Sequence, residues 1–219
     1  MTPGAPGEAV ADPCSDGRLS APSALRNRDA IAAMLAAIAP SRGRALEIAS
    51  GTGEHVIRFA AALPGLNWQP TDPDPARRAS IAAWCATGPF PNVAAPIALD
   101  ACRPGWACGM EPHDLVFVAN LLHLVTDDQA RACLAGMAQA LAPGGMAAIY
   151  GPFLRDGCTT SDGDAAFHGR IRSETPGAGY KDLAWVDAVW AEAGLDRDAP
   201  RAMPANNLLL VARKTGTLS

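Results

Sequence analysis

The sequence predicts an α/β fold with a doubly wound, mostly parallel sheet and helices on both of its faces. Short apolar segments, typical of buried strands, alternate along the chain with amphipathic segments of helical period. Turns rich in Gly and Pro separate them. Right-handed crossovers between parallel strands make such a sheet doubly wound. In a doubly wound sheet we expect any ligand to bind beyond the carboxyl ends of the strands.

Composition narrows the class of protein. The chain has 219 residues, 49% of them hydrophobic, and a net charge of -4, which fits one domain with a large core. It shows neither an apolar run of membrane length nor a basic start followed by an apolar stretch, so neither a membrane helix nor a secretory signal is expected. The acidic balance and the lack of a basic stripe argue against nucleic acid as a partner.

The cysteines and histidines indicate a reducing compartment and no metal. None of the six cysteines forms a C-x-x-C pair, which argues against a zinc ribbon or a redox motif. A disulfide framework is not expected in a chain of this size without a secretory signal. The cysteine usage therefore predicts a reducing, cytoplasmic location. No two histidines have metal-binding spacing, so we expect no metal site.

Each element has its own local signal. Residues 23–39 carry apolar side chains at helical spacing, and further helices are expected after the turn at 50–53, from Pro75, after Thr126 and after Asp182. The expected strands are residues 45–49, 67–71, 93–99, 114–119, 146–150 and 206–213.

Two segments depart from this alternation. Residues 1–19 are rich in Pro, Gly, Ala and Asp without periodicity and are expected to form a flexible tail before a single domain at 20–219. Residues 151–180 are polar and Gly-rich, with a short helix expected near 165–172. A loop of this length inside a compact domain is usually functional, so we expect a lid-like insertion.

A glycine turn, Ser50-Gly51-Thr52-Gly53, joins the first strand to a helix. Glycine permits a positive φ and close approach of a ligand, and a helix start offers free N–H groups. The dinucleotide fingerprint requires a third Gly where Val56 stands, and the Glu47 carboxylate is a poor neighbour for pyrophosphate. The Glu47 carboxylate is a better neighbour for a ligand that carries a cationic amine. The alternative is a turn that only connects a strand to a helix.

Acids follow the next two expected strands. Asp72 lies about twenty residues beyond the turn, where a carboxylate can bind a ribose diol, or can cap the following helix instead. Asp100 can accept from an exocyclic amine such as that of adenine. A ligand with an amine, a ribose and an adenine but no phosphates is S-adenosylmethionine.

At this point the sequence resembles the class I S-adenosylmethionine-dependent methyltransferases. More closely, residues 20–213 resemble the DUF938 family, which includes relatives of methyltransferase-like protein 26. The matching segments are Ser20–Arg28, Leu46–Gly53, Trp68–Asp74, Ala119–His123, Tyr150–Phe153 and Met203–Asn207. The resemblance implies a Rossmann-like, seven-stranded sheet with an antiparallel last strand. Ala49 departs from the motif, which often has its first Gly there, and Ala30 replaces a frequent Pro.

The strand ends and the resemblance together give the expected cofactor site. Arg26 and Asn27, at the start of the first helix, are expected to fold over the cofactor, although Arg26 as a solvated helix residue remains an alternative. The expected cofactor-binding residues are Arg26, Asn27, Glu47, Ala49, Ser50, Gly51, Gly53, Asp72, Pro73, Asp100, Ala101 and Asn120.

His123 and Tyr150 are the candidate catalytic residues. His123 follows the fourth expected strand and has an ordinary pKa suited to proton transfer at neutral pH, or it only orders the loop. Tyr150 ends the fifth expected strand and is expected to wall the acceptor pocket. His55 is expected at the surface or at the cofactor's edge, and His113 at the wrong end of the sheet.

The predicted function is methyl transfer from S-adenosylmethionine to a small-molecule acceptor by in-line displacement. A hydroxyl acceptor needs a base, whereas a thiolate, a carboxylate or a neutral amine does not. A short peptide as acceptor stays open. The alternatives are a nicotinamide-dependent oxidoreductase and a non-catalytic S-adenosylmethionine-binding protein.

Overall fold

The computed structural model describes residues 12–215, and its centre is a seven-stranded mixed sheet. Four strands run parallel in the order β4-β3-β5-β6, and β11 lies antiparallel beside β6. The sheet strands are β3 (Gly43–Ile48), β4 (Leu66–Pro70), β5 (His113–Ala119), β6 (Leu141–Gly151), β9 (Leu195–Arg197), β10 (Arg201–Ala202) and β11 (Leu208–Lys214). The predicted α/β fold with an antiparallel last strand is confirmed.

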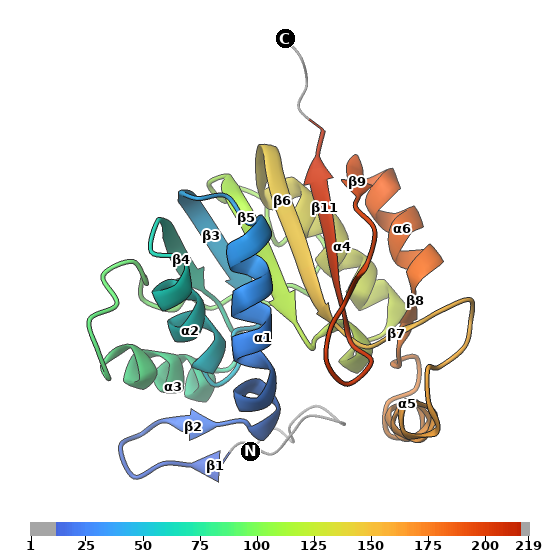
Figure 1. Ribbon diagram of the computed structural model, residues 1–219, viewed down its shortest axis with the longest axis horizontal. Helices are drawn as coiled ribbons and strands as arrows, with labels where there is room; N and C mark the ends of the chain where they lie inside the picture. Colours follow the sequence, from blue (N-terminus) through green and yellow to red (C-terminus); the bar gives the residue numbers. More distant parts are fainter. Residues whose placement is uncertain (1–11, 216–219) are drawn as a thin grey trace.

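Helices cover both faces of the sheet (Figure 1). On one face lie α1 (Pro22–Ile38), α2 (Glu54–Ala62) and α3 (Pro75–Cys85); on the other lie α4 (Asp127–Ala140) and α6 (Leu183–Glu192). Alternation along β5 explains the two layers, because successive side chains of a strand point to opposite faces. Leu115 and Phe117 pack with the first group of helices, while Val116 and Val118 pack with the second.

Caps fix where the helices begin. The Asp74 carboxylate accepts from the Ala76 N–H at 2.8 Å, so Asp74 rather than Asp72 caps α3. Thr126 caps α4 as predicted, and together with Gln129 it forms a capping box. Asp182 caps α6 as predicted, by accepting from the N–H of Ala184 at 2.9 Å.

The prediction of a regular strand at 93–99 was wrong. This segment runs beside β4 but forms only two isolated parallel bridges, Trp68 with Val93 and Thr71 with Ile97. Pro96 has no N–H to donate and interrupts the ladder between them. The sheet reaches seven strands through the short strands β9 and β10 instead.

Residues 12–19, expected to belong to a flexible tail, form a small hairpin with Ser20. Its strands are β1 (Asp12–Pro13) and β2 (Leu19–Ser20). The N–H of Leu19 donates to Ser80 Oγ at 2.8 Å, and Trp84 Nε1 donates to the Leu19 carbonyl at 2.9 Å. The hairpin is therefore attached to α3. Residues 1–11 lie outside the described part of the chain.

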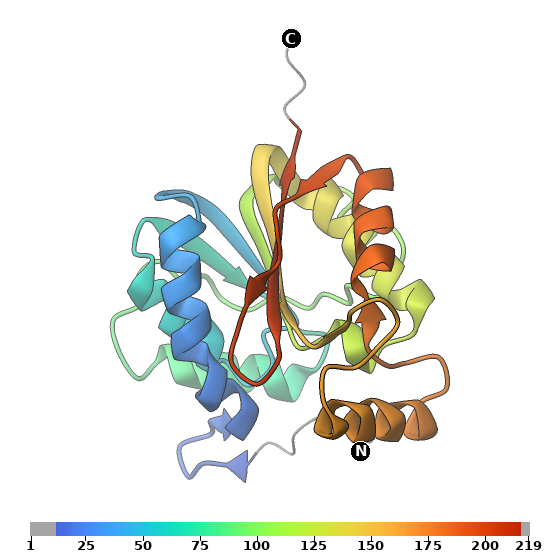
Figure 2. The same ribbon diagram turned by 45° about the vertical axis from the view of Figure 1, so that its right-hand side comes forward.

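The insertion at 151–180 lies at the carboxyl edge of the sheet (Figure 2). It contains β7 (Phe153–Leu154) and α5 (Asp162–Glu174), and β7 pairs in parallel with β8 (Lys181–Asp182). The helix is longer than the one expected at 165–172. Buried Ile171 packs with Ala178 and Tyr180, so α5 has a small core of its own.

Within residues 12–215, every helix is too short or too polar to cross a membrane.

Candidate functional site

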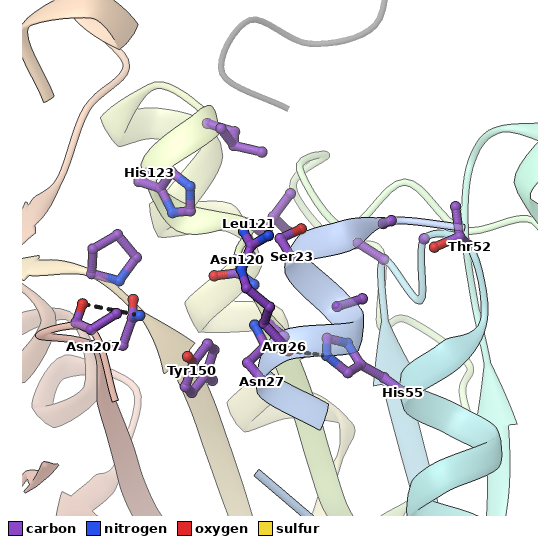
Figure 3. Close-up of a pocket in the computed structure, with 18 of the residues that line it drawn as sticks. Ser23, Arg26, Asn27, Thr52, His55, Asn120, Leu121, His123, Tyr150 and Asn207 are labelled. Atoms are coloured by element: carbon purple, nitrogen blue, oxygen red, sulfur yellow. Dashed lines mark hydrogen bonds between the residues drawn. The ribbon is translucent and has the colours of Figure 1, made fainter. Parts of the chain in front are cut away.

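A cavity of about 910 Å³ opens at the carboxyl edge of the sheet. The start of α1, the turn after β3, the ends of β5 and β6, and α5 all contribute to its lining. Figure 3 shows His123 and Asn207 on one side of this pocket and Thr52 and His55 on the other, with Asn120 between them. We call these the lid side and the turn side.

The structure brings most of the candidate residues to this cavity, but not all. The predicted residues that line it are Arg26, Asn27, Ala49, Ser50, Gly51, Asn120, His123 and Tyr150. Those outside the lining are Glu47, Gly53, Asp72, Pro73, Asp100 and Ala101.

The turn after β3 has left-handed backbone at Ala49 (φ 50°), Gly51 (φ 59°) and Gly53 (φ 107°). A Cβ on Gly51 would meet only the Ala49 carbonyl oxygen, at 4.0 Å, so this glycine leaves open space at the cavity. A Cβ on Gly53 would lie 2.9 Å from Ile81 Cα, so this glycine permits close packing of α3.

Asp72 supports the turn from below. It is 1% exposed, and its carboxylate accepts from the N–H of Gly51 at 3.0 Å and from that of Asp74 at 2.9 Å. Burial raises the pKa of this carboxyl, while the two backbone hydrogen bonds oppose the rise. The alternative that Asp72 caps α3 is excluded, since Asp74 has that role.

Glu47 lies beneath the same turn and is fully enclosed. Its Oε2 has no hydrogen-bond partner among the described residues. Burial raises the pKa of Glu47 to about 8, and the nearby Asp72 and Glu54 add to the rise. Glu54 accepts from the N–H of Ala21 at 2.7 Å and also from the Thr52 hydroxyl, which places the start of α1 against the glycine turn.

Asp100 is bound to its own loop. Its Oδ1 accepts from the N–H of Cys102 at 3.1 Å, and its Oδ2 pairs with Arg103 at 3.2 Å. Pro73 is exposed, and Ala101 is buried in the core on the α4 side.

Asn120, directly after β5, has a φ of 55°, a conformation that Asn tolerates better than most residues. Its N–H donates to the Tyr150 carbonyl at 2.8 Å. The ends of β5 and β6 are thereby held together at the floor of the cavity. Burial raises the pKa of the Tyr150 phenol, and hydrogen bonds with Asn27 and Asn207 oppose the rise.

His55 contributes more to the site than the sequence indicated. Its Nε2 lies 2.7 Å from Asn27 Oδ1, and its ring stacks on Phe59 with centroids 5.4 Å apart. It lines the cavity and is 8% exposed, so a surface position is excluded. Burial lowers its pKa to about 4, and the imidazole is neutral at neutral pH.

His123 is buried on the lid side of the cavity. Its ring centroid lies 5.9 Å from that of Phe167 and 6.0 Å from that of Tyr180. Burial, with a smaller effect of Lys181, lowers the pKa of His123 to about 4. The imidazole is therefore neutral at neutral pH and able to accept a hydrogen bond or a proton.

His113 lies at the start of β5, at the opposite edge of the sheet from the cavity, as expected.

Sequence reasoning missed the lid-side residues of the insertion, Asp164, Phe167, Arg170 and Tyr180. Their only sequence signal was the insertion itself. Asp164 already accepts hydrogen bonds from Ser161 at 2.8 Å and Asn206 at 3.0 Å, which attaches α5 to the turn before β11.

In residues 12–215 no three His, Cys, Asp or Glu side chains cluster as metal ligands would.

Comparison with solved structures shows the fold. An O-methyltransferase family protein from Burkholderia thailandensis superposes with a TM-score of 0.76 at 19% identity, over 89% of this chain and 58% of that one. Human N-acetylserotonin methyltransferase in complex with SAM gives 0.68 at 16%, over 87% and 55%. An O-methyltransferase family 2 protein from Planctomyces limnophilus, in complex with apigenin, gives 0.70 at 21%, over 84% and 56%. The chain thus spans little more than half the length of these proteins.

A family model described as "Protein of unknown function (DUF938)" matches residues 18–214, nearly the whole of the part that the structure describes. The chain belongs to the DUF938 family, and it has the Rossmann-like fold of the class I methyltransferases.

Proposed function

We propose that this protein binds S-adenosylmethionine and transfers its methyl group to a small-molecule acceptor. One observation carries the proposal: a single cavity has an open glycine turn on one side and a buried, neutral histidine among aromatic rings on the other. Its volume of about 910 Å³ is at the upper end of the usual range for small-molecule pockets, which leaves room for an acceptor beside a cofactor.

The turn side fits the cofactor in its shape and chemistry. Gly51 leaves space where a side chain would block a ligand, and the buried Glu47 Oε2 beneath it lacks a partner. We assign the cofactor's amino acid end to the turn, Arg26, Asn27 and Asn120, and its nucleoside to the side of Asp72 and Asp100. Asp72 then acts on this end of the cofactor by holding the Gly51 turn in place.

The cofactor, once bound, supplies an activated methyl group, so the protein must align the acceptor and exclude water. We assign the orientation of the acceptor to His123 and Tyr150, which both line the cavity. The low pKa of His123 weakens it as a base but keeps its ring free to accept a hydrogen bond from the attacking group. This suits an acceptor whose proton is acidic or absent.

The structural neighbours support the same reading. The human N-acetylserotonin methyltransferase structure is a complex with SAM, and the Planctomyces limnophilus structure is a complex with apigenin, a small molecule. Fold alone does not decide the chemistry. The proposal for this chain therefore depends on the cavity and its lining.

A nicotinamide-dependent oxidoreductase is the second candidate. Its fingerprint requires a small residue where Val56 stands, and the Val56 side chain is fully buried in the core beneath the turn. A non-catalytic S-adenosylmethionine-binding protein is the third candidate.

Two measurements test these candidates in sequence. Calorimetric titration should show micromolar binding of S-adenosylmethionine and S-adenosylhomocysteine and no binding of NADH; the reverse result would replace the proposal by the oxidoreductase. Incubation with methyl-labelled cofactor and a fractionated metabolite pool should then label a small molecule. Binding with no labelled product would favour the non-catalytic protein.

A further inference from the structure

The lid side of the cavity carries one cation that the described residues do not pair. Arg170 of α5 lines the cavity, and its guanidinium carbon lies 5.1 Å from the centroid of Phe167, over the ring. No ion pair joins it to a carboxylate in the described part of the chain. Stacking on an aromatic ring orients a guanidinium and leaves its N–H donors free for a carboxylate.

The carboxylate of Asp164, in the same part of the cavity, already accepts hydrogen bonds from the protein. Asp164 accepts from the hydroxyls of Ser161 and Tyr180 and from the side-chain amide of Asn206. His123 adds no positive charge, because its buried ring is neutral at neutral pH. Arg170 therefore supplies a positive charge on the lid side that no carboxylate of the described residues pairs, whereas the oxygens of Asp164 already accept hydrogen bonds.

Aromatic rings connect this charge to the proposed reaction centre. Phe167 contacts Arg170 and also lies 5.9 Å from His123, between centroids, while Tyr180 lies 6.0 Å from His123. These distances limit the separation of Arg170 and His123 to a length that one small molecule spans. Aromatic walls favour a flat ring between the two groups.

We propose that the methyl acceptor is a small aromatic carboxylic acid, with its carboxylate on Arg170 and its reacting group at His123. This inference rests on the proposed function, because it concerns the second substrate of that same cavity. The cofactor carries a positively charged sulfonium and does not itself require this arginine.

The test uses two simple probes, 4-hydroxybenzoate and its neutral amide, 4-hydroxybenzamide. Each is titrated by calorimetry into the full chain saturated with S-adenosylhomocysteine. The acid should bind about ten- to a hundredfold more tightly than the amide, as expected for a charge-assisted contact. Arg170→Met should remove this preference while leaving affinity for the amide and for S-adenosylhomocysteine unchanged.

Arg172→Met is the matched control. It removes the same charge from the same helix, but Arg172 does not line the cavity. This variant should retain the preference for the acid. Equal binding of acid and amide by the wild-type chain, no binding of either at millimolar concentration, or a preference that survives in Arg170→Met would each overturn the inference. If Arg172→Met also loses the preference for the acid, that preference comes from the overall positive charge of α5 rather than from Arg170. This result would also overturn the inference. A chain that binds no S-adenosylhomocysteine contradicts the proposed function instead.

Discussion

The backbone N–H of Gly51 donates a 3.0 Å hydrogen bond to the carboxylate of Asp72, so the turn after β3 is fixed to the end of β4. The other carboxylate oxygen accepts from the N–H of Asp74 at 2.9 Å. One side chain thus sets the shape of the turn that opens on the cavity. A ribose contact by Asp72 would be added to this structural role.

Asp72→Ala should therefore reduce both stability and cofactor affinity. Two partly buried backbone donors lose their acceptor, which should cost about 1–3 kcal/mol of unfolding free energy. Affinity for S-adenosylhomocysteine should fall about tenfold or more. Chemical denaturation and calorimetry measure the two effects. Asp196→Ala, at an exposed position of β9, is the control and should change neither. A less stable Asp72→Ala protein with wild-type affinity would contradict the cofactor assignment.

Gly51→Ala and Gly53→Ala should differ in what they damage. At Gly51 a Cβ has space, so the left-handed φ costs about 1–2 kcal/mol and the main loss should be in cofactor binding. At Gly53 the Cβ would lie 2.9 Å from the α3 backbone at Ile81, so stability should fall further. Paired melting and titration experiments separate the two. Wild-type affinity in Gly51→Ala would place the ligand elsewhere.

Ala49→Gly should stabilise the protein. Ala49 has a φ of 50°, and an L-residue with a Cβ pays about 1–2 kcal/mol there, whereas glycine does not. The greater freedom of glycine in the unfolded chain offsets part of this gain, so we expect a net rise of about 0.5–1 kcal/mol. Ala147→Gly in β6 is the control and should destabilise. A destabilised Ala49→Gly protein would show that the Cβ packs usefully at the turn.

Sequence patterns predicted the layered fold because both of its signals are local. The apolar alternation of β5 and the helical period of α1 are readable in a single window of sequence. The segment at 93–99 has a strand's composition, but Pro96 removes the donor that a continuous ladder needs. No local pattern shows that the hairpin of residues 12–20 attaches to Ser80 and Trp84 of α3.

The candidate site was predictable to the extent that it follows strand ends. The turn at Gly51 and the residues Asn120 and His123 lie where parallel strands terminate, and all of them line the cavity. Asp100 also follows its segment, but its loop turns the carboxylate toward Cys102 and Arg103. The lid side depends on how α5 packs, a tertiary property that spacing along the sequence does not encode.

Glu47 should make stability fall as pH rises. Its folded-state pKa, about 8, lies above the ordinary carboxyl value in the unfolded chain, so the folded protein holds this proton more tightly. The stabilisation is complete below about pH 4 and is lost progressively up to about pH 8. Glu47→Gln removes the titration. Denaturation between pH 5 and pH 8 should show a smaller loss for Glu47→Gln than for the wild-type chain. Parallel curves for the two proteins would contradict the prediction.

The last prediction concerns His123. If it removes a proton from the acceptor, His123→Ala should lower kcat about 10²–10⁴-fold and leave cofactor affinity nearly intact. Because burial lowers its pKa to about 4, the rate should stay level from neutral pH down to about pH 5 and fall only as pH approaches 4. An exposed histidine would give that fall near its ordinary pKa of 6.5. His113→Asn, at the opposite edge of the sheet, is the control and should keep the wild-type profile.

A positioning role for His123 gives a different pattern. The loss in His123→Ala should then appear mainly in KM, and His123→Asn, which retains a hydrogen-bonding group, should recover much of it. An acceptor that reacts as a carboxylate or a thiolate needs no base and should show this second pattern, because nothing has to be deprotonated in the attack. Steady-state kinetics of the two variants against the labelled acceptor decide between the roles. Unchanged kcat, KM and pH profile in His123→Ala would remove this residue from the site, and the reacting group would then have to be sought near Tyr150 or His55, which also line the cavity.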